Sequence, residues 1–407
     1  MKLLHIADLH LRDRDIDEAE KCLEYLAGYA EQEEDVDLIV IAGDVFDSQD
    51  VKMESKAAGL AVKSISDFAD IAPVAIVVGT PSHDGMAPII LSHVRGGYDI
   101  LVADRPSQYA LRRGGFFPTD GSDRCYTDAD AVISLVPQPT KQYFQTAAGI
   151  QDGNQEIGEA MTAIFASFGL SATLYPGAPH ILVGHFNARG AALSNGQVLV
   201  GMDIEITPDQ IEAARADLVC LGHIHKAQQI RSNIFYSGSV YHINWGEMEA
   251  KGGYVHDVEA AGSKPQSTFI ECPAKKMLRF AFDATADENA EITLDDYLNA
   301  LAADVRQAYA RLDITVWQDQ AREIDKDKLR RFFLAGGALD LDIRIVRVPR
   351  HNVRAEAVLK AERLRDKIRR MAELRGEEVE WSILAKADSL EDSLSPDDLI
   401  SELGRAA

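Results

Sequence analysis

The first hundred residues alternate between short unbroken apolar runs and longer segments in which apolar residues recur every three or four positions. The runs at 2–7, 38–42 and 74–78 predict strands. The run at 38–42 lacks period-two alternation, so we expect that strand to be covered on both faces. Segments 16–32 and 53–69 have the spacing of amphipathic helices. This order of strand, helix, strand, helix and strand predicts an α/β fold with a parallel sheet and right-handed crossovers.

Similar patterns continue through the middle of the chain. Residues 155–168 are helical in spacing. A short helix should follow Thr207, because Pro208 occupies the first helical position and Gln210 completes a capping-box spacing. The Gly- and Asp-rich stretch 114–123 is predicted to be a surface insertion. Further strand-like runs occupy residues 100–103, 131–136, 180–185 and 217–221.

The pattern changes near residue 269, after a first domain that we place at 1–268. A small α+β domain is predicted over 269–350. Two roles are open for it: contact with a substrate of the first domain, or packing alone. Its predicted elements are a strand starting at Ile270, alternating strands at 275–282 and 340–347, and a helix at 294–310.

Residues 351–407 form a third part with two differently charged segments. Segment 352–376 holds eight basic and four acidic residues, with apolar positions spaced by four and three. Segment 377–407 holds nine acidic and two basic residues, yet it includes Trp381 and several other apolar residues, and a capped helix start at 395–398. A solvated linker would not need these apolar residues. They predict a pair of helices that docks on the chain's own second domain or on a partner.

Composition narrows the class of protein. A chain of 407 residues with 46% hydrophobic residues has room for two or three domains. It contains no run near the roughly 18 apolar residues of a membrane span, and it begins directly with a strand-like pattern, so we expect no export signal and a cytoplasmic location. Its four cysteines have no paired spacing, which favours reduced thiols. The net charge of −23 argues against broad, unassisted binding to nucleic acid.

Aspartates and histidines follow five of the strand-like runs. Taken singly, each has an ordinary interpretation: Asp44 could be a solvated turn residue, Asp8 a helix cap and His10 a surface residue. Together they recur at the carboxyl ends of strands, where open α/β sheets bind their ligands. The residues are Asp8, His10, Asp44, His83, His185, His223 and His225.

Carboxylates mixed with imidazoles are typical ligands of Mn, Fe or Zn rather than of Mg or Ca alone. Seven candidates exceed the needs of one ion. We therefore predict two divalent ions sharing Asp44, at a separation of roughly 3.5–4 Å, an arrangement that activates water and holds a phosphoryl group.

The order Asp-x-His, Gly-Asp-x-x-Asp, Gly…His-Asp, Gly-His and Gly-His-x-His resembles the calcineurin-like metallophosphoesterase superfamily. The residues around Asp8, Asp44 and His223, with Tyr236 to Ser239, Trp245 to Glu247 and Lys251 to Tyr254, are similar to the SbcD-type nuclease subunit of DNA break repair. The resemblance implies a β-sandwich flanked by helices, with a small α+β cap that contacts DNA, and C-terminal helices. It also implies that one ion is held by Asp8, His10, Asp44 and His225, the other by Asp44, His185 and His223, and that His83 acts on the scissile phosphate.

One motif departs from the family pattern. The family's third motif reads Gly-Asn-His-Asp, with the asparagine as a ligand of the second ion, whereas residues 79–84 here read Gly-Thr-Pro-Ser-His-Asp. Ser82 stands next to His83 in place of the asparagine. We therefore expect activity to survive with a more weakly bound second ion.

Three functions follow from these patterns. The first is a metal-dependent DNA nuclease subunit, with Mn²⁺ as the expected metal, that docks on an SbcC-like ATPase through its C-terminal helices, forms a homodimer and does not bind membranes. The alternatives are a small-substrate phosphodiesterase or phosphatase, and a catalytically weakened assembly subunit. The additional domains favour the first function over the second, and the complete ligand set favours it over the third.

Overall fold

The computed structural model divides the chain into two units. The first unit comprises residues 1–279 together with 305–311 and 336–340, and the second comprises the remainder. Among the described residues, no helix combines the length and the apolar character needed to cross a membrane. The structure describes residues 1–32, 36–119, 127–148, 154–194, 204–286, 292–301, 304–349, 363–375 and 379–393.

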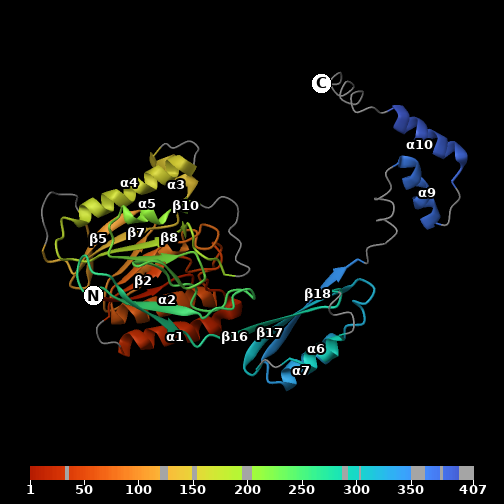
Figure 1. The fold of residues 1–407 in the computed structure, drawn as a ribbon. Helices are drawn as coiled ribbons and strands as arrows, with labels where there is room; N and C mark the ends of the chain where they lie inside the picture. Colours follow the sequence, from red (N-terminus) through yellow and green to blue (C-terminus); the bar gives the residue numbers. More distant parts are fainter. Residues whose placement is uncertain are drawn as a thin grey trace. The chain divides into compact units, whose positions relative to one another are not determined.

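One sheet of the first unit has six strands in the order β15, β14, β1, β2, β3, β4. It lies on the side of helices α1 and α2 in Figure 1. Strands β1 to β4 are mutually parallel, while β14 runs antiparallel to β1, and β15 antiparallel to β14. The bounds are β1 Lys2–Ile6, β2 Val36–Ala42, β3 Val74–Val77, β4 Ile100–Ala103, β14 Gly252–Asp257 and β15 Gln266–Glu271. Helices α1 (Ile16–Gln32) and α2 (Lys56–Ile71) and the 3-10 turns η1 (Asp13–Asp15) and η2 (Ala87–His93) lie between these strands in sequence.

The other sheet has seven strands in the order β12, β13, β11, β8, β7, β5, β6. Strands β7, β8, β11 and β13 are parallel, and the two edges are antiparallel hairpins. The strands are β5 Ser107–Arg112, β6 Gly115–Pro118, β7 Ala131–Val136, β8 His180–His185, β11 Leu218–Gly222, β12 Gln228–Arg231 and β13 Ile234–Tyr236. The connecting elements are α3 Lys141–Ala148, α4 Asn154–Ala172, α5 Pro208–Glu212 and the short paired strands β9 Asn187–Ala188 and β10 Glu205–Ile206.

The two sheets pack face to face, and helices cover both outer faces. Val40 of β2 and Val183 of β8 belong to the core between the sheets. Ile39 and Ile41 point the other way, into the core under α1 and α2, and a third core lies under α3, α4 and α5. Residues 38–42 are therefore buried on both faces, as their unbroken apolar run predicts. Each fully buried Ile or Val stabilises the fold by about 1.5–3 kcal/mol.

The second unit contains most of a sheet whose strands lie in the order β16, β17, β18. A helical pair, α9 and α10, follows it in sequence, with an ion pair between Arg365 and Asp388. The elements are β16 Lys276–Asp283, α6 Leu294–Asn299, β17 Ala308–Trp317, α7 Lys326–Ala335, β18 Asp340–Val348, α9 Leu364–Arg375 and α10 Trp381–Ser393. The fold class expected from the sequence, a helix-flanked β-sandwich with a further α+β sheet and C-terminal helices, is confirmed.

Three expectations differ from the structure. The helix predicted at 294–310 ends at Asn299, because alternate burial of Ala308, Ala310 and Leu312 makes the following residues a strand. The boundary predicted after residue 268 falls inside β15, which pairs with β14 in the first sheet. Within the predicted insertion, Gly115–Pro118 forms the edge strand β6. Residues 120–126, 350–362 and the capped helix start at 395–398 lie outside the described residues.

Candidate metal centre

All seven predicted residues come together where the strands of the two sheets end. Three sets of side chains each have one ligand atom per residue within 4.8 Å of the others. These sets are Asp8, His10 and His225; Asp44, His185 and His223; and His10, Asp44 and His83. Parallel strands β1, β2, β3, β8 and β11 supply them, so the carboxyl ends of five strands build one centre.

The backbone of this centre is strained. Asp8, His10, Asp44 and His223 have φ angles of 52°, 40°, 50° and 91°, in the left-handed region that non-glycine residues seldom adopt. Such positions cost of order 1–3 kcal/mol each and persist where surrounding contacts hold them. Here the His10 N–H donates to the Asp44 carbonyl at 2.9 Å, which ties the first two strand ends together.

Two glycines allow the loops that follow β2 and β3 to pack closely against neighbouring residues of the centre. Gly43 has φ +83°, and a Cβ there would lie 2.3 Å from Nδ1 of His185. A Cβ at Gly79 would lie 2.2 Å from the backbone nitrogen of Asp44. Both positions therefore exclude any side chain, because such distances are far inside van der Waals contact.

The first ligand group, Asp8, His10 and His225, is supported by buried charges. Nε2 of His10 and Nε2 of His225 face each other at 3.1 Å. The Nδ1–H of His225 donates to Glu247 at 2.8 Å, and Glu247 in turn pairs with Nζ of Lys251 at 2.8 Å. Glu247 and Lys251 are 0% and 1% exposed. Burial raises the pKa of Glu247, but the His225 hydrogen bond and the Lys251 charge outweigh it and lower that pKa to about 2.

The second ligand group, Asp44, His185 and His223, is supported by neutral groups. Nε2 of His185 lies 3.3 Å from Oδ2 of Asp44, and its Nδ1–H donates to the Ala42 carbonyl at 2.7 Å. Burial lowers the pKa of His185, but the Asp44 charge and hydrogen bond outweigh it and raise the pKa to about 9. Conversely, burial raises the pKa of Asp44, but His185 and His10 outweigh it and hold that pKa well below its usual range.

Thr80 belongs to this second group, although the sequence pattern did not single it out. Its N–H donates to Oδ1 of Asp44 at 2.5 Å, and its Oγ1 lies 3.1 Å from Oδ2 of Asp44 and 3.2 Å from Nε2 of His185. Ser82, which the motif comparison placed in the asparagine position, is exposed. The two extra residues of this loop thus bring Thr80, rather than Ser82, beside Asp44.

His83 lies at the edge of the centre. Its ring centroid is 4.7 Å from that of His10, and its Nδ1–H donates to the Asp47 carbonyl at 3.1 Å. This bond leaves Nε2 of His83 for contacts outside the loop. Next to it, the fully buried Asp84 accepts N–H bonds from Phe46 at 2.9 Å and Gly79 at 2.7 Å, so it joins the Asp44 and His83 loops.

The donor set fits divalent metal ions. Asp8 and Asp44 are 0% and 2% exposed, and buried carboxylates need compensating positive charge. Nitrogen and oxygen donors in this mixture are suited to Mn, Fe or Zn. Bound ions of this kind supply an activated water and stabilise charge on a phosphoryl group.

Comparisons with known proteins agree with this chemistry. Among curated proteins, the SbcD component of the nuclease SbcCD from Rhodobacter capsulatus is 26% identical over 307 residues, covering 70% of this chain and 73% of that protein. The protein of the same name in Escherichia coli strain K12 is 26% identical over 347 residues, covering 79% and 76%. A solved structure titled "GAP50 the anchor in the inner membrane complex of Plasmodium" overlaps with a TM-score of 0.44 at 14% identity, covering 67% of this chain and 84% of that one, which supports no argument.

The family model for calcineurin-like phosphoesterases matches residues 1–227, more than half of the chain and the whole range that supplies the seven side chains. The chain therefore belongs to the calcineurin-like phosphoesterase family and is a metal-dependent phosphoester hydrolase.

Proposed function

We propose that this protein is a DNA nuclease subunit that hydrolyses phosphodiester bonds with two Mn²⁺ ions. The observation that carries the proposal is the position of Asp44 between the two ligand groups. Its Oδ2 lies 3.6 Å from Nε2 of His10 and 3.3 Å from Nε2 of His185. A single carboxylate that faces both groups can hold two cations at the short separation that phosphoryl transfer requires. The similarity to curated nuclease subunits supports DNA as the substrate.

In this proposal each side chain has a defined role. Asp44 bridges, and His83 donates from Nε2 to the phosphate oxygen or to the leaving oxygen when that nitrogen carries a proton. The first ion is held by Asp8, His10, Asp44 and His225, and the second by Asp44, His185 and His223.

The decisive experiment compares substrates. The purified protein, supplied with Mn²⁺, is incubated with end-labelled duplex, hairpin and single-stranded DNA, and in parallel with a chromogenic phosphodiester. We expect cleavage of DNA, and its loss in Asp44→Asn. Cleavage of the chromogenic compound without DNA cleavage would instead indicate a small-substrate phosphodiesterase. Inactivity toward all substrates with both ions bound would indicate an assembly subunit.

His83 tests the catalytic assignment separately from metal binding. His83→Ala should lower turnover by about 10²-fold, the lower range for a positioned proton donor, while metal content per chain stays unchanged. His93, on η2, is exposed, and His93→Ala provides the matched control. Loss of metal from His83→Ala would make this residue a ligand rather than a proton donor.

The proposal includes a partner, an SbcC-like ATPase that binds the C-terminal helices. Leu384 and Ala387 of α10 are buried, whereas Trp381, Ile383 and Leu390 of the same helix are 76%, 47% and 52% exposed. Exposed apolar side chains grouped on one helix are typical of a protein-binding surface.

Removal of all residues after Pro349 should abolish co-purification with the ATPase and leave hydrolysis of the chromogenic phosphodiester intact. Trp381→Glu should reproduce the loss of binding, and Ser382→Glu on the same turn should reproduce it less strongly.

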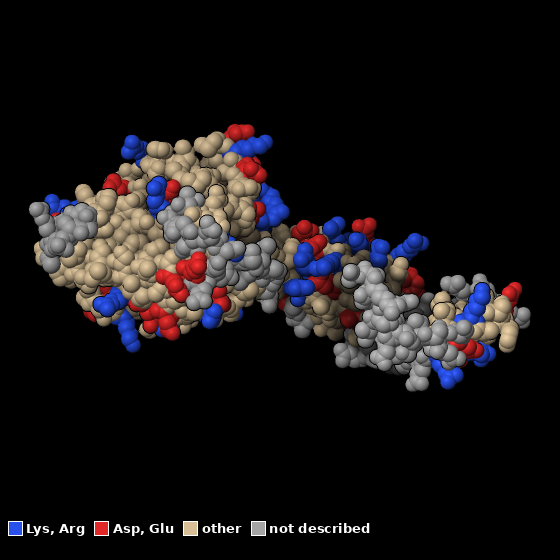
Figure 2. All heavy atoms as spheres, turned by 90° about the horizontal axis from the view of Figure 1, so that it is seen from above, with Lys and Arg blue, Asp and Glu red and all other residues tan. Residues whose placement is uncertain are grey.

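The second unit offers a surface for DNA. In Figure 2, Lys and Arg side chains, mixed with acidic ones, lie close together over the part that contains β16 to β18. Arg331, Arg344 and Arg347 are exposed there. We propose that such residues contact the phosphate backbone and that the active form is a homodimer. Arg344→Ala and Arg347→Ala should weaken DNA binding and its salt dependence without changing hydrolysis of the small substrate.

A further inference from the structure

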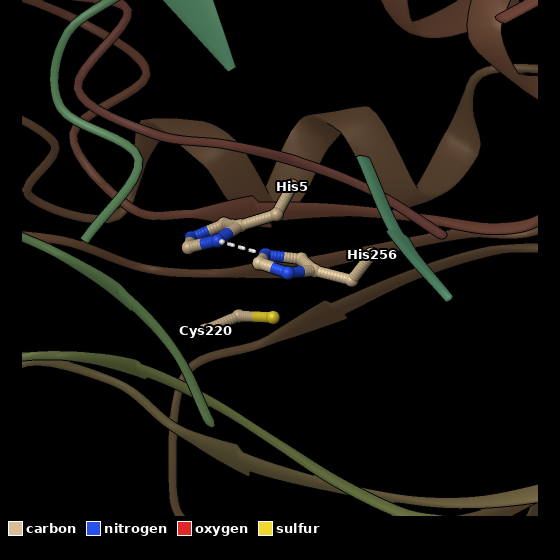
Figure 3. A group of neighbouring side chains, drawn as sticks. All are labelled: His5, Cys220 and His256. Atoms are coloured by element: carbon tan, nitrogen blue, oxygen red, sulfur yellow. Dashed lines mark hydrogen bonds between the residues drawn. The ribbon is translucent and has the colours of Figure 1, made fainter. Parts of the chain in front are cut away.

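A second group of metal-ligating side chains lies inside the β-sandwich, away from the strand ends. His5 comes from β1, Cys220 from β11 and His256 from β14, so the group joins the two sheets (Figure 3). All three side chains are 0% exposed. One nitrogen from each imidazole and the sulfur of Cys220 lie within 4.8 Å of one another. In Figure 3 the two rings lie side by side, and the sulfur lies beneath His256.

The spacing of two ring nitrogens is that of a ligand pair. Nδ1 of His5 and Nε2 of His256 are 3.3 Å apart. Two nitrogens bound at about 2.0–2.1 Å to a tetrahedral ion are separated by about 3.3–3.4 Å. The observed spacing therefore matches the one that a bound ion requires, and the sulfur of Cys220 lies within 4.8 Å of one nitrogen of each ring.

The outer nitrogens of both rings are also satisfied as metal ligands require. Nε2 of His5 lies 3.2 Å from the Leu221 carbonyl and donates its N–H to it. Nδ1 of His256 lies 2.7 Å from Oγ of Ser267, which can accept the N–H of that ring. A metal-bound histidine almost always donates its other N–H to an oxygen, because this fixes the ring and its tautomer. Burial lowers the pKa of His5 to about 3, so its imidazole is neutral and can ligate.

We propose that His5, Cys220 and His256 bind one ion of the Zn²⁺ class. Two imidazoles and a thiolate are borderline-to-soft donors, and the group contains no carboxylate, so it discriminates against Mg²⁺ and Mn²⁺. On binding, the Cys220 thiol loses its proton to solvent as the metal–sulfur bond forms. Three protein donors leave one position of a tetrahedral ion for a further small ligand.

An ion at this site would stabilise the strands that lead into the loops of the catalytic centre. His5 lies on β1, three residues before Asp8, and Cys220 lies on β11, three residues before His223. An ion bound by His5 and Cys220 would cross-link the two sheets close to the loops that carry Asp8 and His223. Because an ion that binds only the folded chain stabilises it by mass action, removing the site should lower the melting temperature.

Cobalt gives a readout that separates this site from the catalytic centre. The protein is produced with Co²⁺ present during folding, because the group is fully buried. A thiolate bound to Co²⁺ has a sulfur-to-cobalt charge-transfer absorption in the near ultraviolet, which the nitrogen and oxygen ligands of the catalytic centre cannot produce. We expect this absorption in the wild type and in Asp44→Asn, competition by Zn²⁺, and one ion fewer per chain in Cys220→Ser together with loss of the band.

Cys22→Ser is the matched control and should keep the band, because Cys22 is equally buried on α1 and belongs to none of the ligand groups that the described residues form. His256→Gln should lose it, which provides a second variant if Cys220→Ser fails to fold. Absence of the band in the cobalt-loaded wild type would overturn the proposal without any variant and would leave the two histidines as a hydrogen-bonded pair. A band that survives in Cys220→Ser would overturn it as well.

Discussion

The two ligand groups of the catalytic centre contain the same kinds of side chain but are held by different surroundings. In the first group, Nδ1 of His225 donates to Glu247, which forms a buried ion pair with Lys251. In the second group, Nδ1 of His185 donates to a backbone carbonyl, and the Thr80 hydroxyl lies next to Nε2 of the same ring. A carboxylate that accepts from the outer nitrogen makes an imidazole a stronger ligand than a neutral oxygen does. We therefore expect the first ion to bind more tightly than the second.

Removing what the two groups share should have the largest effect. Asp44→Asn takes away the negative charge that both groups face, so the repulsion between two nearby cations is no longer offset. We expect a loss of Mn²⁺-dependent phosphodiester cleavage on the order of 10³-fold, corresponding to several kcal/mol of transition-state stabilisation. Asp67→Asn, at an exposed position on α2, is the control. Near-normal cleavage by Asp44→Asn would show that the ions do not share this residue.

The first group can be weakened selectively through Glu247. Glu247→Gln should reduce affinity for the tighter ion by about 10–100-fold, because the outer nitrogen of His225 loses its carboxylate. It should also destabilise the fold by about 3–5 kcal/mol, since Lys251 remains buried without its main partner. Metal titration and thermal unfolding measure the two effects separately.

Two further variants distinguish the two effects of Glu247→Gln. Adding Lys251→Met should restore stability but not metal affinity, because the uncompensated buried cation is gone while the carboxylate is still missing. Glu249 also contacts Lys251, at 3.1 Å, but the outer nitrogen of His225 donates to Glu247, so Glu249→Gln should leave metal affinity unchanged. If Glu249→Gln and Glu247→Gln lowered affinity equally, the effect would come from the local charge and not from the His225 bond.

The difference between the groups also explains what the sequence could predict. The position of these seven side chains at strand ends could be predicted, because each follows an apolar run that can be recognised from the sequence alone. Glu247 and Lys251 belong to stretches that resemble the SbcD-type subunit, but that resemblance does not show that they form a buried pair. Their spacing of four residues does not show it either, because it is typical of many exposed pairs.

Loop conformation was the other limit. The contact of Thr80 with Asp44 depends on how the loop 79–84 packs against residues 44–46, and a motif alignment places Ser82 there instead. The prediction of a helix at 294–310 was wrong in its last part for a related reason. Alanine-rich segments favour a helix locally, but pairing in the β16–β18 sheet makes residues from 308 onward a strand. Sequence patterns thus identified side chains that lie close together at the strand ends, but not the contacts that surround them.

Thr80 provides the corresponding test of the second group. Thr80→Val keeps the shape of the side chain and the N–H bond to Asp44 but removes the hydroxyl next to His185. We expect about a tenfold loss of affinity for the weaker ion, at the low end of such effects, with the tighter ion unchanged. Thr80→Ser should retain affinity, and Ser82→Ala should have no effect. A loss caused by Ser82→Ala but not by Thr80→Val would restore the motif-based alignment of this loop.

The last prediction is a pH dependence of the second ion's binding, and its sign follows from His185. The pKa of this residue is raised to about 9 in the metal-free chain, so at neutral pH the ring is protonated. A metal ion needs the neutral ring, so binding must release that proton, and apparent affinity should rise about tenfold per pH unit up to about pH 9 and then level off. Calorimetric titration at pH 7 in buffers of different ionisation enthalpy should show about one proton released per second ion. Asp84, whose pKa is raised to about 7 by burial and by Asp44, could add to this release, so Asp84→Asn serves as the control. If the affinity of the wild type and of Asp84→Asn did not change between pH 7 and 9, His185 would already be neutral. Proton release would then be coupled to the first ion, not to the second.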